Sequence, residues 1–156
     1  MDIKKRVDRI AKFYQTRDPF EIVRGLNVIV VHFPLDGVRG FYQYFQRNNI
    51  IYLDERLPEH EQRFVLAHEL GHMFLHKKSN AIFMDTRTQF NTSRYEIEAD
   101  LFAMCLLVPD DLLLEYSDYS TSQFSRMLGY HEKLVELRRC LPVTLCNSQK
   151  RKEVFL

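Results

Sequence analysis

The stretch "VLAHELGHMFLH" at residues 65–76 contains side chains whose types and spacing suit metal-dependent chemistry. In an α-helix, His68 and His72 lie on one face, roughly 40° and about 6 Å apart, so both imidazoles can approach one ion. Glu69 lies beside them and can take a proton from a water molecule that such an ion makes more acidic. The pattern therefore predicts a Zn²⁺ site for hydrolysis, with His68 and His72 as ligands and Glu69 as the catalytic base.

A surface helix with solvated histidines is the alternative interpretation of this stretch. The neighbouring residues argue against it, because they predict a largely buried helix in which ionisable side chains need partners. These neighbours are Phe64, Val65, Leu66, Ala67, Leu70, Met73, Phe74 and Leu75. His76 lies about 12 Å along the axis from His68, too far for one ion to bind both. We interpret His76 as a polar helix end or a packed residue.

The third ligand is expected from a second helix, since catalytic zinc usually has three protein ligands and an open position. In the acidic segment "YEIEAD", Glu96 and Asp100 share one helical face. We predict Glu96 as the ligand and Asp100 as the acceptor for the other ring N–H of a ligand histidine. Glu98 points about 200° away from Glu96; it is the alternative ligand, and otherwise faces solvent or a basic neighbour.

Glu96 also has a competing role at its own helix terminus. The residues "SRYE" at 93–96 fit a capping box, in which Ser93 is the N-cap and Glu96 turns back to it. Asn91 and Thr92 can cap the helix instead, which leaves Glu96 free for a metal ion. Both arrangements are compatible with the sequence.

The elements that must position these residues are predicted from hydrophobic periodicity and turn signals. Helices are expected over 3–14, 59–76 and 92–109, a long loop over 77–91, and short helices after residue 109. Strands are expected over 27–33, 41–46 and 50–54, forming a small antiparallel sheet. This order predicts an α+β fold in which the sheet packs on the histidine-bearing helix.

Composition narrows the class of protein. The 156 residues suggest a single domain over 1–156, and a hydrophobic fraction of 46% is enough for a core. A net charge of +1 argues against direct nucleic-acid binding, and no apolar run reaches the roughly 20 residues that span a bilayer. The three cysteines, Cys105, Cys140 and Cys146, are expected to be reduced thiols. Without a signal-peptide pattern, the chain is predicted to be cytoplasmic.

The segments "RFVLAHELGHMFLH" and "YEIEADLFAMCLLVP" together resemble the ImmA/IrrE family of bacterial metallo-endopeptidases, which pairs H-E-x-x-H with E-x-E-A-(D/N)-x-F-A. The resemblance covers residues 20–115, taken as a metallopeptidase core, with a C-terminal helical segment over 116–140. It implies a zincin-like minidomain and supports Glu96 and Asp100 in the roles given above. It also implies a protein substrate, since family members typically act on a helix-turn-helix repressor of a mobile element or prophage, and cleavage relieves repression.

Two other functions are compatible with the same residues. One is a metal-bound anti-repressor that binds its partner without cutting it. The other is a DNA-binding regulator that uses residues 121–138, whose two short helical patterns resemble a helix-turn-helix, although packing or partner docking is favoured. For a peptidase, residues 50–54 would hold an extended substrate if they form an edge strand. Tyr95 and His131 are considered as oxyanion donors, but such residues are more often packed or solvated.

Overall fold

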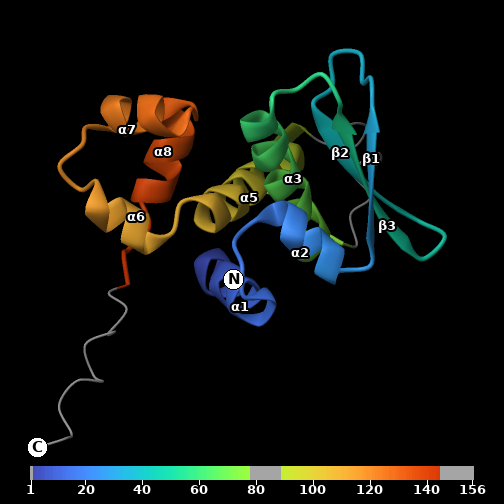
Figure 1. The fold of residues 1–156 in the computed structure, drawn as a ribbon, viewed down its shortest axis with the longest axis horizontal. Helices are drawn as coiled ribbons and strands as arrows, with labels where there is room; N and C mark the ends of the chain where they lie inside the picture. Colours follow the sequence, from blue (N-terminus) through green and yellow to red (C-terminus); the bar gives the residue numbers. More distant parts are fainter. Residues whose placement is uncertain (1, 78–88, 145–156) are drawn as a thin grey trace, which may run out of the picture.

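The chain has the α+β arrangement expected from its sequence, with a small sheet and helices that pack against it. The computed structural model describes residues 2–77 and 89–144, and Figure 1 shows how they are arranged. The helices are α1 (Ile3–Tyr14), α2 (Pro19–Gly25), α3 (Glu59–Leu75), α5 (Gln89–Leu107), α6 (Asp110–Glu115), α7 (Thr121–Leu128) and α8 (Glu132–Arg139). The strands are β1 (Val28–Phe33), β2 (Gly40–Phe45) and β3 (Asn48–Asp54).

Two helices begin where the sequence analysis does not place them. The sequence does not predict α2, yet Asp18 caps it by accepting a hydrogen bond from the Phe20 N–H at 2.9 Å, and Pro19 starts it. α5 begins at Gln89 rather than at residue 92. The predicted loop over 77–91 lies largely outside the described residues, as does the end of the chain after residue 144.

The sheet is mixed, so the prediction of an antiparallel sheet is wrong for one of its two pairings. β3 lies in the centre, parallel to β1 and antiparallel to β2. β2 and β3 form a hairpin at Gln46 and Arg47, whose positive φ angles of 47° and 67° suit a tight turn. Ile51 and Leu53 on β3 are fully buried, as expected of a central strand. Residues 50–54 are therefore not an edge strand, and β1 and β2 form the edges.

α3 lies between the sheet and α5 (Figure 1). Its residues Leu66, Ala67 and Leu70 are fully buried, which confirms the prediction of a largely buried helix. On α5, Phe102 is also fully buried and stacks on Phe74 of α3, with ring centroids 5.7 Å apart. The main hydrophobic core thus holds together the two helices that carry the candidate site residues.

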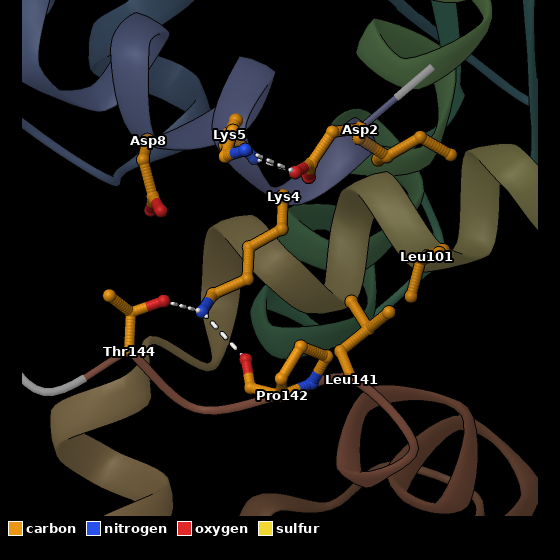
Figure 2. A pocket seen from close by; sticks show the side chains of 9 residues that line it. Asp2, Lys4, Lys5, Asp8, Leu101, Leu141, Pro142 and Thr144 are labelled. Carbon is orange, nitrogen blue, oxygen red and sulfur yellow. Dashed lines mark hydrogen bonds and ion pairs between the residues drawn. The ribbon is translucent and has the colours of Figure 1, made fainter.

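The C-terminal helices are joined to α1 and α5 through a cluster of charged side chains. Arg138 of α8 is 1% exposed, donates to the Val108 carbonyl oxygen at 2.8 Å, and pairs with Asp110 at 2.5 Å. Lys4 of α1 pairs with the other oxygen of Asp110. It also donates to the Pro142 carbonyl oxygen and to the Thr144 hydroxyl, each at 2.8 Å (Figure 2). These contacts hold the C-terminal segment against the rest of the chain.

The remaining sequence predictions concern thiols, the membrane and the C-terminal helices. Cys105 is buried and Cys140 is exposed, and both are free thiols as expected; Cys146 lies outside the described residues. Within residues 2–77 and 89–144, no helix is both long and apolar enough to cross a membrane. The two helices expected over 121–138 are α7 and α8, and Gly129 ends α7 with a φ of 74°.

Candidate metal centre

The long buried helix α3 supplies the first three residues of the site. Pro58 is its N-cap, and Glu59 and Glu61 lie in the first turn, where carboxylates interact favourably with the helix dipole. Further along the helix, Glu69 is 6% exposed and His72 is 7% exposed. Charged or polar groups buried to this extent need specific partners. Glu96 on α5 is the partner of His72, and the backbone N–H of Tyr42 on β2 is the partner of Glu69.

Three side chains from α3 and α5 converge on one point. The Nε2 atoms of His68 and His72 lie 3.0 Å apart. From Glu96 on α5, Oε2 lies 3.1 Å from His68 Nε2 and Oε1 lies 3.2 Å from His72 Nε2. The structure therefore brings together the three residues that the sequence analysis predicts as ligands, and His68, His72 and Glu96 form a candidate metal centre.

The donor set and its spacing fit a divalent metal ion. Metal–ligand bonds of about 2.0–2.1 Å place two ligand atoms of a tetrahedral site roughly 3.3 Å apart. The two Nε2 atoms lie 3.0 Å apart, each lies within 3.2 Å of one oxygen of Glu96, and one donor atom from each residue lies within 4.8 Å of the others. Two imidazole nitrogens and a carboxylate oxygen are ligands that zinc prefers. Lone pairs on three such atoms repel one another unless a cation or shared protons lie between them.

Asp100 lies behind His68, on the side away from the converging atoms. Its Oδ1 is 2.8 Å from His68 Nδ1. An ionised carboxylate only accepts hydrogen bonds, so Nδ1 of His68 donates to Asp100. In the neutral ring that metal binding requires, the lone pair then lies on Nε2, the atom that faces His72 and Glu96. The contact orients the ring in the way that carboxylate partners orient metal-binding histidines.

Glu98, the alternative ligand, turns to a different partner. Its Oε2 lies 2.8 Å from His76 Nε2, and its Oε1 accepts from Arg94 Nε at 2.9 Å. Arg94 is the basic neighbour that the sequence analysis allows for Glu98. His76 is the C-cap of α3 and is 6% exposed, which agrees with its interpretation as a helix end and a packed residue. Burial lowers the pKa of His76.

The capping-box interpretation of Glu96 is wrong. α5 begins at Gln89, so Ser93 lies inside the helix and is not its N-cap. The carboxylate of Glu96 faces α3 instead. The cluster of Asn91, Thr92 and Ser93 offers several residues of the type that caps helices, and the sequence alone does not show that the helix starts earlier.

Carboxylates dominate the electrostatics of the centre. Burial lowers the pKa of His68, but hydrogen bonds to Asp100 and Glu96 outweigh it, and the pKa rises to about 10. Hydrogen bonds from both histidines hold the pKa of Glu96 well below its usual range, whereas burial raises the pKa of Glu69. This arrangement favours a bound cation, and it prepares Glu69 to accept a proton nearer to neutral pH than an exposed glutamate does.

The two residues considered as oxyanion donors have other neighbours. Tyr95 packs edge-on against the ring of His76, with centroids 4.4 Å apart. His131 is the N-cap of α8, where its Nδ1 accepts from the Lys133 N–H at 3.3 Å. Neither position supports the oxyanion role.

Comparisons with known proteins agree with this geometry. Residues 23–137 match a peptidase family described as the IrrE N-terminal-like domain. Over 139 residues the chain is 37% identical to "Uncharacterized immunity region protein 2" of Bacillus phage phi105, covering 87% of this chain and 88% of the relative. Over 119 residues it is 32% identical to "Metallopeptidase ImmA" of Bacillus subtilis, covering 75% of this chain and 69% of the relative. The chain therefore belongs to the IrrE N-terminal-like family of metallopeptidases.

Proposed function

We propose that the protein is a zinc-dependent endopeptidase that cuts a helix-turn-helix repressor and so relieves repression of a mobile element or prophage. The observation that carries the proposal is the convergence of His68, His72 and Glu96, with Glu69 buried next to the first of them. Residues 20–115 form the catalytic core of this proposal, and residues 116–140 form a segment that packs on it.

The roles of the residues follow from their chemistry. His68, His72 and Glu96 would hold the zinc ion, which when bound would polarise a peptide carbonyl and make a water molecule more acidic. Glu69 is the base that would take a proton from the attacking water and deliver it to the leaving nitrogen, a contribution of about 10²–10⁴-fold in rate. Asp100 keeps the His68 ring turned so that Nε2 faces the metal.

The free edge of β2 offers a place for the substrate backbone. The backbone N–H of its residue Tyr42 donates to the Glu69 carboxylate, and this hydrogen bond offsets part of the rise that burial causes in the pKa of Glu69. β2 pairs only with β3 among the described strands, so its other edge is available for an extended peptide. We assign the substrate-holding role to β2, in place of residues 50–54 of the central strand.

The choice of substrate rests on the relatives. The relative from phage phi105 is named for an immunity region, which supports a role in the control of a prophage. The family resemblance supports a helix-turn-helix repressor as the protein that is cut.

The decisive variant is Glu69→Gln, with Glu59→Gln in the first turn of the same helix as the control. The purified protein is incubated with zinc and with a helix-turn-helix repressor of the element that carries its gene, and products are identified by mass spectrometry. We expect Glu69→Gln to keep its zinc and to lose at least about 100-fold in cleavage rate, while the control cleaves like the parent. Derepression in cells by Glu69→Gln as strong as by the parent would instead identify an anti-repressor that does not cut.

The DNA-binding alternative is disfavoured by the packing of α8. Arg138 is 1% exposed and paired with Asp110, so it cannot reach a DNA phosphate in this fold. Arg139 donates to the Tyr119 carbonyl oxygen at 2.9 Å and lies over the ring of Phe124. Tight, salt-sensitive and sequence-selective binding in a gel-shift titration would reverse this assignment.

A further inference from the structure

We infer that His76 is a positioning residue for the metal centre: with Glu98 behind it, it fixes the ring of His72 as Asp100 fixes the ring of His68. The inference rests on the proposed function in so far as that function requires a metal on His72. It assigns a role to a third histidine that is too far from His68 to be a ligand of the same ion.

The contacts form a chain that leads away from the metal centre. His72 Nδ1 lies 3.4 Å from His76 Nδ1. His76 Nε2 lies 2.8 Å from Glu98 Oε2, and the other oxygen of Glu98 accepts from Arg94 at 2.9 Å. The side chain of His76 is 4% exposed, so water does not replace these partners.

The direction of each hydrogen bond follows from what the groups can donate. Glu98 is paired with Arg94 and is therefore an ionised acceptor, so His76 Nε2 must carry the proton. In a neutral imidazole this leaves a lone pair on His76 Nδ1, which can only accept. His72 Nδ1 then donates, and the lone pair of His72 lies on Nε2, the atom 3.0 Å from His68 Nε2.

The arrangement goes beyond what a helix end requires. The backbone N–H of His76 already closes α3 by donating to the His72 carbonyl oxygen at 2.8 Å, and this bond needs no imidazole. The side chain could point to solvent there, yet it is buried between His72, Glu98 and the ring of Tyr95. Each candidate histidine ligand of α3 is thus oriented through its Nδ1, in one case directly by a carboxylate and in the other through His76.

Three variants separate this role from simple packing. His76→Phe keeps a ring and removes both polar contacts. His76→Asn places an amide oxygen at the position of Nδ1, so it can still accept from His72, and asparagine is tolerated at helix ends. His60→Phe, at an exposed histidine in the first turn of the same helix, is the matched control. Zinc affinity is measured by competition with a chromophoric chelator, and thermal unfolding of the metal-free proteins reports folding.

We expect zinc to bind about 10–100-fold more weakly to His76→Phe, most of the affinity to return in His76→Asn, and His60→Phe to match the parent. In the zinc-loaded parent, ¹H–¹⁵N spectra of the imidazoles should show the Nδ1–H form of His72 and the Nε2–H form of His76. This spectrum needs no variant, so it tests the inference even if His76→Phe does not fold.

Parental zinc affinity in His76→Phe, or an Nδ1–H form of His76, would overturn the inference. Equal losses of affinity in His76→Phe and His76→Asn would also overturn it, because the accepting atom would then not matter. These outcomes are distinct from failure of the proposed function. A parent protein that binds zinc but cuts no repressor refutes the peptidase and leaves the positioning role to be judged by the variants. A parent that binds no zinc refutes both.

Discussion

Gly71 lies at a close contact between α3 and α5, next to His72 and facing the helix that supplies Glu96. A Cβ added at this position would lie 3.0 Å from Ala99 Cα, 3.1 Å from Phe102 Cβ and 3.2 Å from the Ala99 carbonyl oxygen. Two of these three atoms are backbone, so a side-chain rotation cannot relieve the contact. We predict that Gly71→Ala separates the two helices and weakens the metal centre more than it weakens the fold.

The magnitude follows from the distances. Carbon atoms in favourable contact lie about 3.5–4.0 Å apart, so α5 has to move by a few tenths of an ångström at Ala99. Overpacking of this kind costs about 1–3 kcal/mol, and the better helix propensity of alanine offsets about 0.8–1.0 kcal/mol of it. We therefore expect the free energy of unfolding to fall by roughly 0–2 kcal/mol.

The metal centre is more sensitive to the same displacement. Glu96 is one helical turn from Ala99, so its carboxylate moves with the backbone that Gly71→Ala pushes away. Constellations of this kind must be held within about 0.5 Å of the binding geometry. We expect zinc affinity to fall on the order of tenfold, comparable with loss of a residue that orients a ligand.

The assay compares urea unfolding of the metal-free proteins with zinc affinity from chelator competition. Val135→Ala is the control: Val135 is fully buried in α8, and losing two methyl groups costs about 1.6 kcal/mol or more. Val135→Ala should unfold more easily and bind zinc like the parent. Unchanged zinc affinity in Gly71→Ala would refute the reasoning, and so would an equal loss in Val135→Ala.

Three further predictions concern the metal and the charged cluster. Asp100→Ala removes the acceptor for His68 Nδ1 and should weaken zinc binding about 10–100-fold, measured by the same competition. Zinc at about 100 times its dissociation constant should stabilise the parent by about 2.7 kcal/mol, seen as a rise in calorimetric Tm that a chelator reverses. Burial raises the pKa of Asp110, but Lys4 and Arg138 outweigh it and hold that pKa below 3.8. The ionised Asp110 therefore stabilises the fold fully at a pH above the pKa of this group in the unfolded chain. This stabilisation is lost as the pH falls through the lower pKa of Asp110 in the folded protein. Asp110→Asn should cost about 3 kcal/mol near neutral pH, and urea titrations at about pH 3 should show a smaller difference from the parent.

The residues that meet at the centre are predictable because both motifs are local. The spacing in H-E-x-x-H places His68 and His72 on one face of a helix, and the spacing of Glu96 and Asp100 does the same on a second helix. The hydrophobic pattern around the histidines then predicts that the first helix is buried, which the full burial of Leu66 and Leu70 confirms. Periodicity along one element is enough for these inferences.

The sheet shows where local patterns are insufficient. The sequence predicts all three strands near their observed positions, but not the parallel pairing of β1 with β3. That pairing depends on which strand occupies the centre, and short apolar strands are similar in composition. The burial of Ile51 and Leu53, the clearest sign of a central strand, results from packing on other elements.

The role inferred for His76 depends on packing between helices in the same way. A spacing of eight residues rules out a shared ion for His68 and His76, and that conclusion holds for the observed helix. The spacing does not predict that the ring of His72 links the other two. In the structure the ring centroids of His68 and His72 lie 4.8 Å apart, and those of His72 and His76 lie 5.5 Å apart. Whether the last ring meets a carboxylate depends on how α5 crosses α3. Since Gly71 permits that close crossing, the same contact that brings Glu96 to the ligands also brings Glu98 to His76.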